Sequence, residues 1–144
     1  MAEHPVKLLF DTSVYIPFIN QGIAHPVMAI PQGHPLIYMS AVVMEELYAG
    51  ALDASSIKLL DKMYDTFSRM RRLIVPDAAD WQKTGKVVAQ LGKKYGFEEM
   101  FLSRITHDIL IAVTARKTGA AIITYNLKDF LRIQEYIDFK IYQG

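Results

Sequence analysis

The chain has 144 residues, of which 51% are hydrophobic and 22% charged, and this size and composition predict one globular domain spanning residues 1–144. It contains no cysteine, which excludes a disulfide framework, a thiolate metal site and a cysteine nucleophile. The formal net charge of +1 gives no support for strong nonspecific binding to nucleic acid, and with no signal peptide and no bilayer-spanning apolar run we expect a cytoplasmic protein without membrane contact.

The first part of the chain alternates between apolar runs and helical patterns. Residues 7–10 and 36–39 are short apolar runs that predict buried strands. Ser40 then offers an N-cap for a helix that runs through Tyr48, and Gly50 is placed to end it. Residues 20–35, with three prolines and two glycines, predict an irregular loop between the two strands.

The middle of the chain repeats this pattern. Residues 55–70 carry apolar side chains at helical spacing, and residues 73–75 predict a short strand that ends at Pro76. Asp77 then caps a long helix, which Gly96 closes.

The last third contains the clearest helical pattern. Residues 97–105 are ambiguous, but Thr106 predicts an N-cap for a helix that ends at Gly119. The run "AAIITY" follows as a buried strand, then a turn at Asn126, a short helix through Phe130 and a strand near residues 139–142. Because strands alternate with helices throughout, we predict a three-layer α/β/α domain with a mainly parallel central sheet.

Several acidic side chains follow the predicted strands, where parallel α/β sheets bind their ligands. Asp11 ends the first strand, and Asn126 and Asp129 follow the strand at "AAIITY". Asp108 falls in the first turn of its predicted helix, where the helix macrodipole alone would favour an acid. Taken singly, Asp11 could equally cap a helix or hold a cation.

Glu46 and Glu45 are distinguished by helical phase. Counting from Val42 and Val43, Glu46 falls on the apolar face and Glu45 turns away from it. No lysine or arginine lies within one turn of Glu46, so a distant cation or a metal must offset its desolvation. Carboxylates gathered in this way favour a hard divalent cation, Mg²⁺ or Mn²⁺, and phosphoryl chemistry.

Three stretches resemble the PIN-domain ribonucleases, and among them the VapC-like toxins of type II toxin-antitoxin modules. They are "LLFDTSVYI" at residues 8–16, "MSAVVMEELYAG" at 39–50 and "HDILIAVTARKTGAAIITYNLKDF" at 107–130. Each is weak evidence alone, but they occur in family order across nearly the whole chain.

The resemblance assigns roles to individual residues. Asp11, Glu46 and Asp108 match the catalytic, metal-binding acids of the family, and Ser13 matches the hydroxyl beside the first. The fourth acid comes from a turn here occupied by Asn126 and Asp129, with Thr124 as a supporting hydroxyl; many members have aspartate at the position of Asn126. His107 stands where asparagine is common, and we interpret it as a helix-start residue rather than part of a His-Asp phosphohydrolase site.

The resemblance implies an endoribonuclease that uses Mg²⁺ or Mn²⁺ to hydrolyse RNA, forms a homodimer and is silenced by a cognate antitoxin protein. The alternative is a noncatalytic PIN-like module that binds RNA or acts as a scaffold, for which Asn126 is the motivating feature. A groove for the antitoxin could be lined by Tyr48, Met63, Tyr64 and Phe67, although core packing is the favoured interpretation of this stripe.

Overall fold

The computed structural model describes residues 6–22, 35–96 and 98–143. The strands of the described ranges are β1 (Lys7–Phe10), β2 (Leu36–Ser40), β3 (Leu73–Ile74), β4 (Ala121–Thr124) and β5 (Ile141–Gln143). The helices are α1 (Thr12–Gln21), α2 (Ala41–Ala49), α3 (Ala54–Arg69), α4 (Ala78–Tyr95), α5 (Glu99–Thr118) and α6 (Leu127–Ile133). None of these helices is long and apolar enough to cross a membrane.

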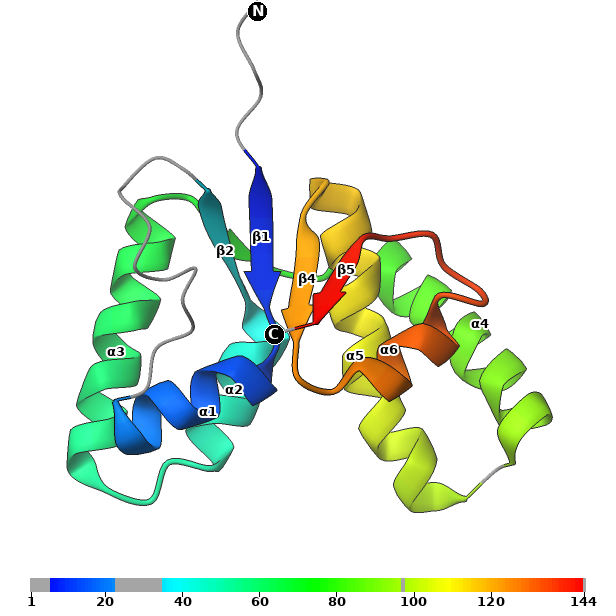
Figure 1. Ribbon diagram of the computed structural model, residues 1–144, viewed down its shortest axis with the longest axis horizontal. Helices are drawn as coiled ribbons and strands as arrows, with labels where there is room; N and C mark the ends of the chain where they lie inside the picture. Colours follow the sequence, from blue (N-terminus) through cyan, green and yellow to red (C-terminus); the bar gives the residue numbers. More distant parts are fainter. Residues whose placement is uncertain (1–5, 23–34, 97, 144) are drawn as a thin grey trace, which may run out of the picture.

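The strands form one parallel sheet in the order β3-β2-β1-β4-β5. Figure 1 shows α1, α2 and α3 on one side of the strands and α4, α5 and α6 on the other. The predicted three-layer α/β/α fold with a parallel central sheet is therefore confirmed.

The central strands β1 and β4 are apolar except for Lys7 and Thr124, because helices cover both faces of the sheet. In β1, Leu9 and Phe10 are fully buried, and they pair with Ile122 and Ile123 of β4. The pairing continues one residue further, where the backbone N–H of Asp11 donates to the carbonyl of Ile123 at 3.1 Å. Asp11 is thus held at the carboxyl edge of the sheet.

The strand order reverses between β1 and β4. The chain leaves β1 through α1 on one side of the sheet and leaves β4 through α6 on the other, and Figure 1 shows the carboxyl ends of both strands pointing toward these helices. Such a reversal opens a crevice beyond the strand ends, and it is the usual ligand site of an open α/β sheet.

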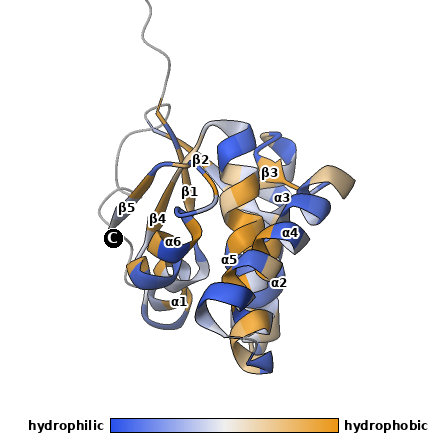
Figure 2. Cartoon of the chain, turned by 90° about the vertical axis from the view of Figure 1, so that its right-hand side faces the viewer, coloured by the Kyte–Doolittle hydropathy of each residue, from blue (hydrophilic) through white to orange (hydrophobic). Residues whose placement is uncertain are grey.

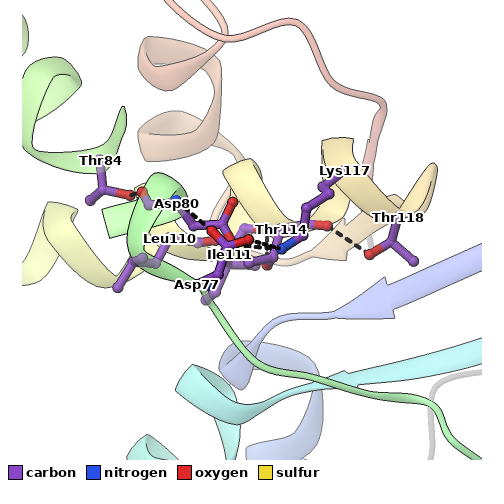
Figure 3. A network of polar contacts seen from close by, with 8 residues as sticks. All are labelled: Asp77, Asp80, Thr84, Leu110, Ile111, Thr114, Lys117 and Thr118. Atoms are coloured by element: carbon purple, nitrogen blue, oxygen red, sulfur yellow. Dashed lines mark hydrogen bonds and ion pairs between the residues drawn. The ribbon is translucent and has the colours of Figure 1, made fainter. Parts of the chain in front are cut away.

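Helix α5 packs against α4 and carries an apolar middle section, which Figure 2 shows in the colour of hydrophobic residues. The two helices are also joined by a polar network at the start of α4 (Figure 3). Buried Asp80 accepts from the backbone N–H of Asp77 at 2.9 Å and from the ammonium of Lys117 at 2.6 Å. Asp77 in turn accepts from the N–H of Asp80, so the cap predicted at Asp77 is present. Lys117 links α5 to this cap through its bond to Asp80.

The predicted start of α5 is wrong. The helix begins at Glu99 rather than after Thr106, and the Thr106 hydroxyl donates to the carbonyl of Leu102 at 2.6 Å, inside the helix. Asp108 and His107 therefore lie in the middle of α5, and neither the macrodipole at a first turn nor a helix-start role explains their positions. The ambiguous residues 98–105 belong almost entirely to this helix.

Two smaller differences concern the chain ends and the loop. The last strand begins at Ile141, so Phe139 precedes it as a buried residue that packs edge-on against Phe130. Of the loop predicted over residues 20–35, the first two residues end α1 and most of the remainder lies outside the described residues.

The aromatic and methionine stripe on α2 and α3 contributes to the core. Tyr48, Met63 and Phe67 are partly buried against it, as core packing predicts, and only Tyr64 of the four is classed as exposed, at 46%. The Tyr48 hydroxyl also donates to Asp61 at 2.6 Å, which links α2 to α3.

Candidate active site

A cavity of about 470 Å³ lies beyond the carboxyl ends of β1 and β4. Its wall includes Asp11 at the end of β1, Glu46 from α2 and Asp108 from α5. Three carboxylates that are far apart in the sequence are therefore brought to one cavity from both helix layers. Ser13 and Asn126 also line this cavity.

Asp11 occupies the N-cap position of α1 but does not cap the helix with its side chain. Its two carboxylate oxygens instead accept hydrogen bonds from the hydroxyls of Ser13, at 2.6 Å, and Thr124, at 2.7 Å. Asp11 thus lines the cavity with its carboxylate bonded to two hydroxyls, and its role as a cation ligand stays a prediction.

Burial raises the pKa of Asp11, and the negative charge of Glu46 adds to this effect. The hydrogen bonds from Ser13 and Thr124 act in the opposite direction, because they stabilise the ionised form. The side chain is 4% exposed, so these two hydroxyls satisfy oxygens that water hardly reaches.

Thr124 is the hub of the hydroxyl network. It is fully buried, it donates to Asp11, and it accepts from the backbone N–H of Asn126 at 2.8 Å. Ser13 similarly accepts from the backbone N–H of Tyr125 at 3.0 Å. The hydroxyls of Ser13 and Thr124 therefore link the turn after β4 to the end of β1 by hydrogen bonds.

Replacing Thr124 with valine should lower the free energy of unfolding by about 1–3 kcal/mol, because it leaves a buried carboxylate oxygen and a backbone N–H without a partner. It should also raise the pKa of Asp11 further, since one stabilising hydrogen bond is lost. Urea unfolding and an NMR titration of the carboxyl carbon would measure the two effects. Thr66→Val removes a similar hydroxyl from the exposed bond to Lys62 on α3, and an equal loss in that control would contradict the prediction.

Glu46 is partly buried and Glu45 is exposed, so the predicted orientation of this pair is confirmed. One Glu46 oxygen accepts from the hydroxyl of Thr12 at 2.9 Å, and the other lies 3.7 Å from Nδ1 of His107. Helices α1 and α5 thus supply a hydroxyl and an imidazole beside Glu46, and the cation or metal expected to offset its charge stays a prediction. Neither Thr12 nor His107 was predicted for this role.

Asp108 is the most strongly perturbed acid of the cavity. Burial raises its pKa to about 8, with further contributions from the negative charges of Asp11, Glu46 and Asp129. Arg104, one turn earlier on α5, lowers the pKa but does not offset these effects. A carboxyl in this environment either keeps a proton at neutral pH or requires additional positive charge.

Asp129 lies behind the cavity rather than on its wall. It is buried, accepts from the side-chain amide of Asn126 at 3.2 Å, and lies 3.7 Å from Nε of Arg104. Asn126 therefore presents its amide between Asp129 and the cavity. Arg104 could have been predicted from its spacing to Asp108 if the helix had been extended toward its true start.

The donor set is all oxygen apart from His107, which suits Mg²⁺ or Mn²⁺ better than zinc. The mutual repulsion of Asp11, Glu46 and Asp108 is the electrostatic condition that a divalent ion relieves. However, within residues 6–22, 35–96 and 98–143 no three His, Asp or Glu side chains lie close enough together to hold a metal ion as they stand. Charge and chemistry fit such an ion, and the side chains would have to draw closer around it.

A protein-family comparison matches residues 8–136 to the PIN domain. The chain belongs to the PIN domain family. The match includes all seven site residues that the resemblance singled out, and PIN domains are generally nucleases that use divalent metals.

Solved structures of VapBC proteins share this fold. VapBC from Salmonella typhimurium, bound to DNA, has 22% identity and a TM-score of 0.67 over 96% of this chain and 98% of that one. VapBC2 from Rickettsia felis, bound to a promoter DNA fragment, has 20% identity and a TM-score of 0.66 over 96% and 99%. VapBC-5 from Mycobacterium tuberculosis, a member of the VapBC family of toxin-antitoxin systems, has 16% identity and a TM-score of 0.62 over 97% and 100%. No curated protein matches the sequence.

Proposed function

We propose that this PIN domain is a metal-dependent endoribonuclease that hydrolyses RNA phosphodiester bonds. The observation that carries the proposal is the meeting of Asp11, Glu46 and Asp108 at one cavity, where burial, and after it the neighbouring negative charges, raise the pKa of Asp108 to about 8. A site with uncompensated negative charge repels an anionic ligand on its own. It can bind a phosphate group when a cation binds with it.

Asp11, Glu46 and Asp108 would hold Mg²⁺ or Mn²⁺. When bound, the ion supplies positive charge that polarises the scissile phosphate and activates water for attack. The hydroxyls of Ser13 and Thr124 hold the Asp11 carboxylate in place, and Thr12 holds that of Glu46. Arg104 adds a positive charge at the edge of the same cavity, where it can contact a phosphate oxygen.

The toxin role is also part of the proposal. It is supported by the fold shared with VapBC proteins, and by the acids and hydroxyls that match VapC-like toxins. We therefore propose a cytoplasmic, homodimeric toxin that is silenced by a cognate antitoxin protein.

A neighbouring pair of glutamates gives a matched test. Purified protein would be incubated with a total small-RNA pool in Mg²⁺ or Mn²⁺ and in EDTA, beside the variants Glu46→Gln and Glu45→Gln. We expect Glu46→Gln to slow metal-dependent cleavage at least about 100-fold, because even an outer-shell partner of a metal ligand contributes 10–100-fold. Glu45→Gln makes the same change on the exposed face of α2 and should cleave like the wild type.

The noncatalytic alternative has its own support, because the described side chains do not form a ready three-ligand metal site. RNA binding without any metal-dependent cleavage by the wild type would favour a binding or scaffolding module. Equal cleavage by both glutamine variants would point to a contaminating nuclease.

A further inference from the structure

A second cavity, of about 530 Å³, adjoins the candidate active site. Its wall is formed by the end of α4, the first turns of α5 and one residue of α6. Met100 and Arg104 line both cavities, so the two are continuous along α5. The second cavity contains none of the acids that match the PIN family's metal site, and we refer to it as the arginine-aromatic cavity.

The central side chain of the arginine-aromatic cavity is Arg132. Its guanidinium carbon lies 4.7 Å from the centre of the Tyr95 ring and 6.0 Å from that of Phe101. Stacking of this kind uses the flat face of the guanidinium and leaves its N–H edge available to an anion. Arg132 is partly buried, so its position is defined by packing as well as by charge.

The Tyr95 ring is itself held in place. Its hydroxyl donates to the carboxylate of Glu135, which also pairs with the ammonium of Lys94. Lys94 therefore offsets the negative charge of Glu135, so Glu135 does not fully neutralise the positive charge of Arg132. Tyr95 remains 39% exposed, and the ammonium of Lys94 also lies 5.2 Å from the centre of its ring.

The two cavities differ in charge. The first carries the carboxylates of Asp11, Glu46 and Asp108 beside the shared Arg104, whereas the arginine-aromatic cavity carries Arg132 and the shared Arg104 against the carboxylate of Glu98. When one phosphate of a nucleic acid strand lies at the candidate metal site, the neighbouring phosphates of the same strand must lie next to that site. The arginine-aromatic cavity offers the next one a positive site.

We propose that the arginine-aromatic cavity binds the nucleotide beside the scissile phosphate of a single-stranded RNA. Arg132 and Arg104 contact its phosphate, and the exposed surface around Tyr95 and Arg132 stacks with its base. Arginine with aromatic rings is the usual combination for single strands, since every base has a face to stack. This inference rests on the proposed nuclease function and adds to it the path of the substrate strand.

Binding of a fluorescein-labelled oligouridylate, followed by anisotropy in EDTA at low salt, tests the inference without cleavage. Arg132→Gln should weaken binding about tenfold and reduce the slope of log affinity against log salt by about 0.7, the value for one phosphate contact on a single strand. Arg116→Gln is the matched control, because it removes the same charge from an exposed arginine at the far end of α5. It should keep the wild-type affinity and slope.

Arg132→Lys separates charge from geometry. It keeps the positive charge but loses the planar stack, so it should keep the wild-type slope while binding more weakly than the wild type. It also decides the matter if Arg132→Gln fails to fold, since weakened binding supports the cavity and wild-type binding overturns it.

Equal affinities for the wild type, Arg132→Gln and Arg116→Gln would overturn the inference and leave the cavity to a protein partner. No binding by the wild type would overturn it as well. Failure of the nuclease proposal is a separate result, because it appears as absence of metal-dependent cleavage and does not alter binding in EDTA.

Discussion

Replacing Asp108 with asparagine should abolish metal-dependent RNA cleavage while leaving the fold intact. The expected loss is about 1,000-fold or more, because the proposed metal ion contributes several kcal/mol of charge stabilisation and depends on this carboxylate. Asparagine has nearly the same shape, and the protein already favours the uncharged form of Asp108 up to a pH of about 8. Cleavage of the small-RNA pool and a circular dichroism melt of the same sample would measure the two effects.

Asp138→Asn is the control for this substitution, because it makes the same chemical change at an exposed residue outside the candidate active site. Full activity of Asp108→Asn would remove Asp108 from the catalytic site. An unfolded Asp108→Asn protein would instead assign the residue a structural role.

The parts of the fold that the sequence predicts correctly are those with strong local signals. In the strand Lys7–Phe10, residues 8–10 form an apolar run because both faces of the sheet are covered, and the bounds of the strand are as predicted. The start of α4 is marked by a capping box at Asp77, and the end of α5 by Gly119 in the left-handed conformation. These signals depend on a few adjacent residues and need no knowledge of the tertiary structure.

The start of α5 has no such signal. Its N-cap residue, Glu98, makes no capping hydrogen bond with its side chain, whereas Thr106 has the chemistry of a cap and lies within the helix. A threonine hydroxyl can bond to the carbonyl four residues earlier, so its presence alone does not mark a boundary. The misplaced boundary also concealed Arg104, which lies one turn before Asp108 on the same helix.

The candidate site shows the same division. A strand end places Asp11 and helical phase places Glu46 at the cavity, whereas Asp108 is assigned through the family resemblance; the structure brings all three there. The contact between His107 and Glu46 joins α5 to α2, and the bond between Thr12 and Glu46 joins α1 to α2. Such contacts depend on how separate helices pack against one another beyond the sheet, which no local pattern encodes.

In the absence of divalent metal, the wild-type protein should lose stability as the pH rises toward 8. Asp108 has a folded-state pKa of about 8 against an ordinary value of 3.8, so between these values the folded protein binds more protons than the unfolded chain. The free energy of unfolding therefore falls as pH increases through this window, and the full penalty is present above the folded-state pKa. The contribution is on the order of several kcal/mol.

Urea unfolding in EDTA at about pH 5 and about pH 8 would measure this loss in the wild type and in Asp108→Asn. The variant lacks the ionising group, so it should lose much less stability over the interval and be the more stable protein at the higher pH. Groups common to both proteins contribute to both curves and largely cancel in the difference. Parallel pH dependence in the two proteins would contradict the raised pKa of Asp108.

Addition of Mg²⁺ or Mn²⁺ at the higher pH should reverse the difference. An ion that binds only the folded wild type stabilises it in proportion to the logarithm of its concentration above the dissociation constant. It should have little effect on Asp108→Asn, which keeps the repulsion between Asp11 and Glu46 but lacks the third carboxylate. An equal rise in stability for both proteins would place the ion elsewhere on the surface, whereas a rise confined to the wild type would identify Asp108 as a ligand independently of any cleavage assay.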